Sequence, residues 1–253
     1  MEEYVRANKL LSEYGYCSRR KADRLIEEGK VVCNDKVLIM GEKVSLHSTL
    51  FVDGKEVAKE TTRKILAFYK PKGIECTANE DVKNNVFHYM NYNKRLMYVG
   101  RLDKDSEGLL LLTNEGDLIN KIMRAGNYHE KEYEVKVDKK INKSFLKDMA
   151  EGVPILDTIT RPCVVEQIDA YQFRIILTQG INRQIRRMCE VFGYKVLSLK
   201  RIRIMNVLLG DLLEGEYREL TNKEEESLRK QIEGSYNTYT KDGKGEKDER
   251  TVI

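Results

Sequence analysis

Residues 100–118 read G-R-L-D-K-D-S-E-G-L-L-L-L-T-N-E-G-D-L, and this stretch decides how the central part of the chain folds. Its apolar run, Leu109–Leu112, shows no alternation of apolar and polar residues. Such a run predicts a strand that is buried on both faces of a sheet. Beyond the strand, Thr113 or Asn114 is expected to cap a helix whose apolar positions are Leu118, Ile119, Ile122 and Met123.

The residues that lead into this strand are polar, namely Arg101, Asp103, Lys104 and Asp105. A carboxylate at the mouth of a buried strand is held rigidly, as a catalytic group must be, and this makes Asp103 a candidate catalytic residue. Asp is also common in ordinary turns, which is the simpler interpretation from the residues alone.

Outward from this stretch, residues 64–222 alternate short β-like runs with amphipathic helical patterns. The runs are Ile65–Tyr69, Gly108–Leu112, Tyr133–Val137 and Phe173–Leu177. They predict an α+β domain with a mixed, mainly antiparallel sheet and flanking helices. Residues 59–63 are polar and are expected to form a linker. Residues 223–253 form a charged tail, helical near Glu224–Ile232 and otherwise expected to be partly disordered.

Residues 1–58 are expected to form a separate, small α/β module. A first helix is predicted over Val5–Tyr14, and Ser18 is expected to cap a second helix that reaches Glu28. Two hairpins follow, with turns at Asn34-Asp35 and Asp53-Gly54.

The second helix of this module begins with a cluster of basic residues, Arg19, Arg20, Lys21 and Arg24. Positive charge at a helix N-terminus opposes the helix dipole, so the cluster calls for another explanation. Contact with RNA phosphates would supply one, and a solvated helix face is equally compatible with the pattern.

A second basic segment lies between Ile181 and Met205, which hold seven basic residues and one acidic residue, a local charge of +6 against +4 for the whole chain. Asn182 is expected to cap a helix with one apolar face, and Arg183, Arg186 and Arg187 to share the opposite side with Glu190. Such density of one sign suits phosphate contact, although a solvated face is again the ordinary alternative.

The composition excludes several classes of protein. The five cysteines are scattered and form no C-x-x-C pair, and the three histidines lie far apart, so neither a disulfide framework nor a metal site is indicated. The chain has no dinucleotide fingerprint or phosphate-binding loop, and we expect no cofactor. It shows no apolar leader and no run of about 18 apolar residues. We therefore expect a cytoplasmic protein without a membrane span.

Residues 5–52 resemble the S4 RNA-binding domain over nearly its whole length. The resemblance rests on R-A-N-K-L-L-S-E-Y-G-Y-C-S-R-R-K-A-D-R-L-I-E-E-G-K-V, which starts at Arg6. It implies that the two helices lie on RNA. The residues implied to touch phosphate are Arg6, Lys9, Arg19, Arg20 and Arg24.

The stretch G-R-L-D-K-D-S-E-G resembles the catalytic motif of the RsuA/RluB/RluE/RluF family of pseudouridine synthases. The resemblance implies that Asp103 is the catalytic carboxylate and that Arg101 displaces the target base from its stack. A guanidinium can fill the space that a flipped nucleotide leaves. For Asp105 we expect only a local turn or capping role.

Three further segments are similar to motifs of the same family, in the same order. Tyr69–Gly73 is similar to its first motif. His129–Tyr133 is similar to the K-x-Y segment, which implies that Tyr133 is an active-site residue, while the core face of a strand would also explain it. Residues 180–188 imply that Arg186 pairs with the catalytic aspartate, keeping it ionised, and that Arg183 and Arg187 contact RNA.

The resemblance implies isomerisation of uridine to pseudouridine without a cofactor or metal. Residues around R-R-M-C-E-V-F-G-Y and R-I-R-I-M-N-V are most similar to the RluF branch, which implies 23S ribosomal RNA as substrate and, in some cases, a tRNA anticodon loop. We expect a monomer. Two alternatives stay open: an RNA-binding or ribosome-assembly factor without catalysis, and a metal-dependent hydrolase or nuclease that uses Asp103 and Asp105.

Overall fold

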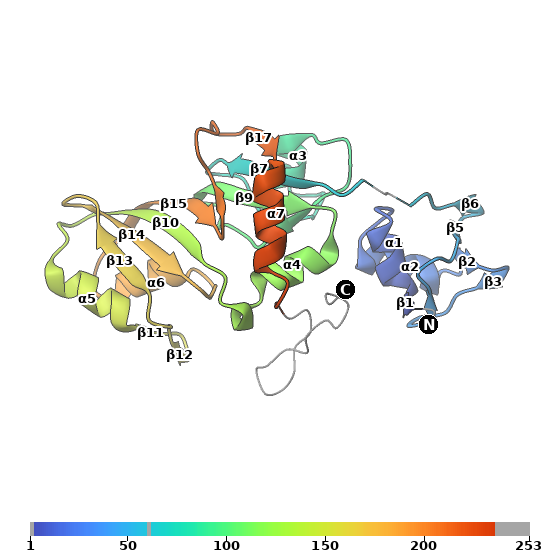
Figure 1. Ribbon diagram of the computed structural model, residues 1–253, viewed down its shortest axis with the longest axis horizontal. Helices are drawn as coiled ribbons and strands as arrows, with labels where there is room; N and C mark the ends of the chain where they lie inside the picture. Colours follow the sequence, from blue (N-terminus) through green and yellow to red (C-terminus); the bar gives the residue numbers. More distant parts are fainter. Residues whose placement is uncertain (1–2, 60–61, 236–253) are drawn as a thin grey trace. The chain divides into compact units, whose positions relative to one another are not determined.

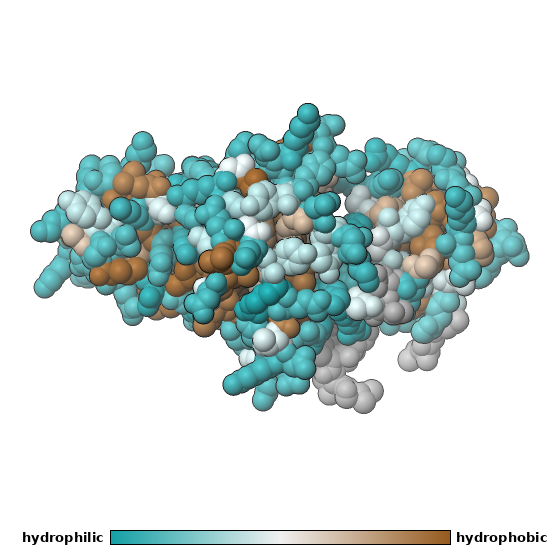
Figure 2. Space-filling view, turned by 90° about the horizontal axis from the view of Figure 1, so that it is seen from above, coloured by the Kyte–Doolittle hydropathy of each residue, from teal (hydrophilic) through white to brown (hydrophobic). Residues whose placement is uncertain are grey.

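The computed structural model describes residues 3–59 and 62–235, and the chain folds into two compact units (Figure 1). Among the described residues, the first consists of those within Met1–Lys64 together with the short segments Tyr92–Met97 and Asn114–Gly116, and the second of the others. Hydrophilic residues cover most of the surface that Figure 2 shows, in keeping with a chain in which 34% of residues are charged. Within the described ranges, no helix is long and apolar enough to cross a membrane.

The first unit packs two helices against small sheets. The helices are α1 (Ala7–Glu13) and α2 (Arg19–Glu27), and their buried residues form a core with the strands. One sheet pairs β1 (Tyr4–Arg6) with β4 (Lys43–Ser45); the other runs in the order β3 (Lys36–Val37), β2 (Val31–Cys33), β5 (Leu50–Val52) and β6 (Lys55–Glu56). Val5 of β1 pairs with Val44 of β4, so the first helix begins at Ala7 and not at Val5 as predicted.

The local signals of this unit act as predicted. The Ser18 side chain accepts a hydrogen bond from the Lys21 backbone N–H and caps α2. Both predicted hairpin turns are formed, and their central residues have φ angles of 49° at Asn34, 60° at Asp35, 49° at Asp53 and 73° at Gly54. Two successive positive φ angles are typical of the turn that joins short twisted strands.

The second unit contains a nine-stranded mixed sheet. Its main order is β13 (Val164–Gln167), β14 (Gln172–Leu177), β10 (Lys131–Val137), β15 (Val196–Ile204), β9 (Glu107–Thr113), β7 (Ile65–Lys70) and β17 (Tyr217–Glu219), while β8 (Met97–Val99) pairs with β9 and β16 (Val207–Leu208) with β15. All the pairs along the main order are antiparallel except β15 with β9. The α+β class and the mainly antiparallel sheet are therefore confirmed.

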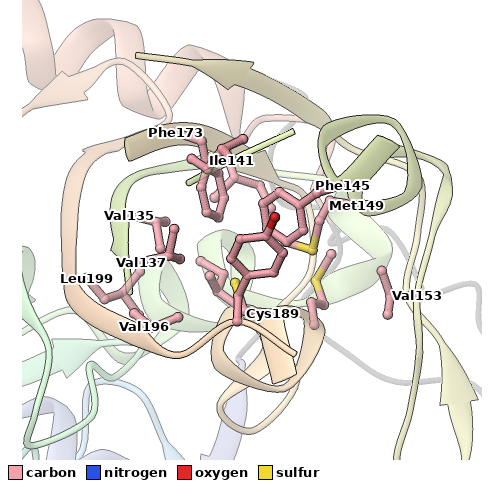
Figure 3. Close-up of a cluster of buried hydrophobic side chains, with 14 of the residues drawn as sticks. Val135, Val137, Ile141, Phe145, Met149, Val153, Phe173, Cys189, Val196 and Leu199 are labelled. Carbon is pink, nitrogen blue, oxygen red and sulfur yellow. The ribbon is translucent and has the colours of Figure 1, made fainter. Parts of the chain in front are cut away.

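Two clusters of buried side chains hold helices to this sheet. In the cluster of Figure 3, Val135 and Val137 of β10 face Phe145 and Met149 of α5 (Lys143–Glu151), and α6 (Gln184–Val191) adds Cys189. A second cluster joins β7 and β9 to α4 (Gly116–Met123). The short elements of this unit are α3 (Val86–Met90), a 3-10 turn at Ala125–Asn127, and the hairpin of β11 (Pro154–Ile155) and β12 (Thr158–Ile159).

Two predicted helix caps are wrong, because the residues expected to cap are used by other partners or belong to a strand. Thr113 belongs to β9, and the Asn114 side chain bonds backbone groups of Thr62 and Lys64 instead of the start of α4. At α6 the N-cap is Arg183, in the left-handed region with φ of 52°, and the oxygen atoms of Asn182 accept hydrogen bonds from Arg187.

The second unit continues past the boundary predicted at residue 222. Helix α7 (Asn222–Gln231) begins at Thr221, whose side chain forms a reciprocal capping box with Glu224. Leu228 and Ile232 join the buried cluster around β7 and β9, so this part of the predicted tail is folded. Disorder was expected for the rest of the tail, but Ser235 is buried and its hydroxyl is hydrogen-bonded to His129. Residues 236–253 lie outside the described residues.

Candidate active site

A cavity of about 390 Å³ opens in the second unit between the sheet and two loops. Its floor is one face of the sheet, where Tyr133 of β10 is paired with Arg201 of β15 and Lys131 with Leu177 of β14. Residues paired directly across an antiparallel ladder point to the same face. Its walls are the loop of residues 100–106 and the loop of residues 179–185, and this volume lies near the lower end of the range of about 300–1,000 Å³ usual for small-molecule sites.

Gly108 allows the strand that follows the loop of residues 100–106 to lie directly against β15. Gly108 of β9 is paired with Arg201 in the parallel β15–β9 contact, and its φ is 103°. A Cβ atom at this position would overlap the backbone of Arg201, so only glycine permits the approach. The loop that enters β9, including Asp103, is therefore fixed at the rim of the floor.

Asp103 stands at the mouth of the cavity, and its side chain is 31% exposed. Its carbonyl oxygen accepts a hydrogen bond from the Ser106 backbone N–H at 3.1 Å, so Asp103 does occupy a turn, as the simpler interpretation of the sequence predicted. Asp103 therefore both forms a turn and lines the cavity. Arg101, exposed at the surface, and half-buried Tyr133 line the same cavity.

The arginines of the 179–187 segment are paired differently from the expectation. Arg183 Nη1 lies 3.6 Å from Asp103 Oδ2, and its two terminal nitrogens donate to the two carboxylate oxygens of Asp105 at 3.2 and 3.3 Å. Arg186 Nη2 lies 3.3 Å from Asp105 Oδ2. In the described part of the chain, the cation beside Asp103 is therefore Arg183, and the structure does not bring Arg186 to the carboxylate with which it was expected to pair.

Arg186 is buried, whereas the sequence pattern placed it on an open helix face. It donates to the backbone carbonyl of Asp105 at 2.9 Å, to Ser106 Oγ at 3.2 Å and to the carbonyl of Val196 at 3.4 Å. These hydrogen bonds hold the loop of residues 103–106 in place. Arg186 thus fixes the backbone that carries Asp103 and does not contact the Asp103 carboxylate.

Asp105 does more than form a turn, because two guanidinium groups hold it. Burial alone would raise the pKa of Asp105, but the hydrogen bond from Arg183 and the charges of Arg186 and Arg183 outweigh burial. The net effect places the pKa of Asp105 below its ordinary value, so this carboxylate is ionised at neutral pH and anchors both arginines.

Lys70 adds a second anchor for the loop. Its ammonium group is fully buried and donates to the carbonyls of Pro71 at 2.6 Å and Ser106 at 2.8 Å, while the Gly73 N–H donates to the carbonyl of Lys104 at 2.7 Å. The segment Tyr69–Gly73 therefore acts on the site through the backbone of the 103–106 loop.

Tyr133 satisfies both interpretations of its sequence context. Its ring packs against the cluster of Figure 3 that contains Val135 and Val137, and the same side chain lines the cavity. A tyrosine can bury its ring and still present its edge and hydroxyl to a ligand.

Sequence reasoning missed Lys131 and Arg201, both on the floor of the cavity. Lys131 belongs to the quoted K-x-Y segment and lies on the same strand face as Tyr133. Arg201 belongs to the basic segment 181–205, in which nothing distinguishes it by charge alone. A charged residue at an inward position of an alternating strand is the signal that could have singled out each of them.

In the first unit, the basic residues predicted to contact RNA are mostly exposed. Arg6, Arg19, Arg20 and Arg24 are exposed, whereas Lys9 is half-buried and lies 3.3 Å from Glu13.

The family model for RNA pseudouridylate synthase matches residues 64–191, and the S4 domain model matches residues 5–44. The chain belongs to the RNA pseudouridylate synthase family. It is 50% identical over 233 residues to the dual-specificity RNA pseudouridine synthase RluF of Salmonella typhi, which covers 91% of this chain and 81% of the relative.

Other members of this family agree. Identity is 34% over 243 residues to the ribosomal large subunit pseudouridine synthase B of Bacillus subtilis (strain 168), covering 92% of this chain and 99% of the relative. A crystal structure of a pseudouridylate synthase, 28% identical, superposes with a TM-score of 0.67 and covers 88% of this chain and 99% of that one. The chain is an RNA pseudouridine synthase with an N-terminal S4 domain, and the family resemblance drawn from the sequence is confirmed.

Proposed function

We propose that this enzyme isomerises a uridine in a bulged or looped segment of 23S ribosomal RNA, and in some cases of a tRNA anticodon loop, with Asp103 as the catalytic carboxylate. The proposal rests on one observation: Asp103 stands at the mouth of a cavity that Tyr133 also lines, and Arg183 lies beside the Asp103 carboxylate. The likeness to RluF supports the choice of RNA.

The site chemistry follows from these positions. The target nucleotide leaves its stack, which costs least in loops and bulges, and Arg101 at the cavity rim fills the space. Uracil then enters the cavity against Tyr133, and the ribose C1′ comes to Asp103. The carboxylate acts in its ionised form, as a nucleophile at C1′ or as a base at the ribose. Arg183 beside it stabilises that form and aligns it.

Arg186 has a positioning role in this scheme. It reaches Asp103 through the backbone of Asp105 and the hydroxyl of Ser106. A shift of about 1 Å in a catalytic group can cost roughly a hundredfold in rate, so a rigid loop matters for catalysis.

The structure favours this reaction over the two alternatives. A protein that only binds RNA needs no cavity with a carboxylate at its mouth. A metal-dependent nuclease would need free carboxylate oxygens, whereas both oxygens of Asp105 accept hydrogen bonds from Arg183.

Replacing the carboxylate tests the proposal. Asp103→Asn should abolish tritium release from RNA labelled with [5-³H]uridine, because the amide can neither attack C1′ nor accept a proton, while the affinity for RNA stays within a few-fold. Glu151→Gln on the exposed end of α5 is the matched control and should retain full turnover. Normal turnover in Asp103→Asn would overturn the assignment. Pseudouridine mapping of ribosomal and transfer RNA from a deletion strain then identifies the substrate.

A further inference from the structure

Two buried cations form part of the cavity floor. Lys131 is 4% exposed and Arg201 is 1% exposed, and both line the cavity at whose mouth Asp103 stands. The Lys131 ammonium donates to the carbonyl of His129 at 3.1 Å, and Arg201 Nε donates to the carbonyl of Leu109 at 2.7 Å. Neither group reaches a carboxylate within the part of the chain that the structure describes.

Hydrogen-bond donors are left without acceptors at this floor. Among the described residues, Arg201 Nη2 is buried and has no hydrogen-bond partner, and the same holds for Nε2 of Gln179, which also lines the cavity. A buried donor without an acceptor destabilises the fold, and more so when the donor is charged. The protein therefore maintains an unfavourable arrangement that an acceptor in the cavity would relieve.

The two cations also oppose each other. Burial, and then the charge of Arg201, lower the pKa of Lys131 to about 8. Uncompensated buried charges are rare unless a site uses them, because desolvation and mutual repulsion both act against them. An anion bound between the two groups would reverse both effects.

The rest of the lining indicates which part of the substrate meets the cations. Leu177, Leu199 and Ile185 give the cavity an apolar lining, which suits a planar base and not a hydrated phosphate. Phosphates are better met at the rim, where Arg101 is exposed and the Arg183 side chain is 41% exposed. The group that faces Lys131 and Arg201 is therefore the uracil ring, which is neutral in the substrate and becomes negative only during the reaction.

We propose that Lys131 and Arg201 stabilise the negative charge that uracil carries while it is detached from the ribose. When the N1–C1′ bond breaks, its electron pair stays on N1 and spreads to the carbonyl oxygens O2 and O4. At the ribose, C1′ gains a bond to an Asp103 oxygen or the sugar loses its C2′ proton, and the uracil anion is the same by either route. C5 then forms the new bond to C1′ while the Asp103 oxygen leaves C1′ or, in the other route, while C2′ regains its proton. Movement of the proton from C5 to N1 restores a neutral, aromatic ring. Fixed cations at the carbonyl oxygens would lower the barrier of the first step.

This inference rests on the proposed uridine site at Asp103. Variants of Lys131 and Arg201 test the inference separately from the role of Asp103. Lys131→Met and Arg201→Met keep the apolar stem and remove the charge. The turnover number at saturating RNA should fall roughly 10²–10³-fold in each, as when one donor to a developing anion is removed. The RNA affinity should stay within a few-fold. The unfolding temperature should change little, because removal of a buried charge that has no carboxylate partner offsets loss of the hydrogen bond to the carbonyl of His129 or Leu109. Lys136→Met, at an exposed position of the same strand, is the control and should behave as the parent enzyme.

The pH profile gives a readout that a structural role would not produce. The turnover number should fall as the pH rises above about 8, because Lys131 then loses its proton. The other charged or titratable groups that line the cavity are Arg201, Tyr133, Asp103, Arg101 and Arg183, and the Lys131 ammonium donates to the backbone carbonyl of His129. Lys131→Arg keeps the charge at high pH, so it should retain much of the activity and lose this alkaline decline, which assigns the decline to residue 131.

A modified substrate tests the charge on the base itself. Fluorine at C5 withdraws electrons, so 5-fluorouracil carries the negative charge more easily and should need the cations less. In single-turnover experiments with 5-fluorouridine-substituted RNA, followed as loss of the nucleoside by mass spectrometry, the rate defect of Lys131→Met should shrink. An equal defect with both substrates, together with a lowered unfolding temperature, would mean a structural role and overturn the inference.

Two other outcomes would also overturn it. A loss confined to RNA affinity and its salt dependence would make the pair a phosphate site. Full turnover in Lys131→Met and Arg201→Met, with Asp103→Asn inactive, would reject the inference and leave the proposed function standing. Activity in Asp103→Asn would reject the proposed function.

Discussion

The two basic helices of the molecule, α2 in the S4 unit and α6 in the synthase unit, use similar sequences in opposite ways. On α2, Arg19, Arg20 and Arg24 are exposed. On α6, Arg186 is buried against a loop of the same unit, and Arg183 at its N-cap holds two carboxylates. The difference teaches that the density of charge in a sequence does not tell whether an arginine meets RNA or the protein itself.

The largest effect in this comparison is expected from Arg186. Arg186→Met should lower the turnover number roughly a hundredfold, because the loop that carries Asp103 loses its bonds to Asp105 and Ser106. It should also destabilise the fold by about 2–3 kcal/mol, since it leaves buried acceptors without a donor. Measuring the turnover number at temperatures below the unfolding transition separates the loss of catalysis from the loss of stability. The control, Lys147→Met, removes an exposed ion pair with Glu151 and should change neither quantity. Full activity in Arg186→Met would show that the loop needs no such anchor.

The exposed arginines of α2 should affect binding and not turnover. Replacing Arg19, Arg20 and Arg24 together by Gln should weaken RNA binding and flatten its dependence on salt, by roughly one unit of slope for each phosphate that the variant no longer neutralises. Turnover at saturating RNA should be unchanged. As a matched control, Lys30, Lys36 and Lys55 of the same unit are replaced by Gln. If both triple variants lose the same affinity, the unit binds through its overall charge and the comparison between the helices fails.

Several elements could be predicted from the sequence because their signal is local. The strand β9 follows from the apolar run Leu109–Leu112, the cap of α2 from Ser18, and the hairpin turns from residues that tolerate positive φ angles. Each depends on residues within a few positions. Tertiary packing reinforces these signals and does not compete with them.

What the sequence could not show depends on partners far along the chain. The bond from Arg183 to Asp105 joins residues 78 positions apart, and the bond from Arg186 to the Asp105 carbonyl joins residues 81 apart. Helical periodicity placed these arginines on a free face because it contains no information about the loop that covers them. The roles of Lys131 and Arg201 were missed for the same reason, since only the order of the strands places both on one cavity floor.

The smallest expected effect is on the pH dependence of stability, which the ion pairs of Asp105 with the α6 arginines should influence and the α2 arginines should not. The pKa of Asp105 is lower in the folded protein than in the unfolded chain, so its ion pairs stabilise the fold fully above the unfolded value. This contribution is lost as the pH falls through the lowered pKa. It should amount to less than about 1 kcal/mol, because the side chain is 50% exposed and solvent screens the pairs. Urea unfolding between neutral and acid pH should show a steeper acid loss of stability for the parent protein than for Asp105→Asn. The triple Gln variant of α2 should follow the parent curve, because the exposed arginines that it removes leave the Asp105 pairs intact. Identical curves for the parent and Asp105→Asn would mean that the α6 arginines hold the loop through its backbone carbonyl and hydroxyl groups alone.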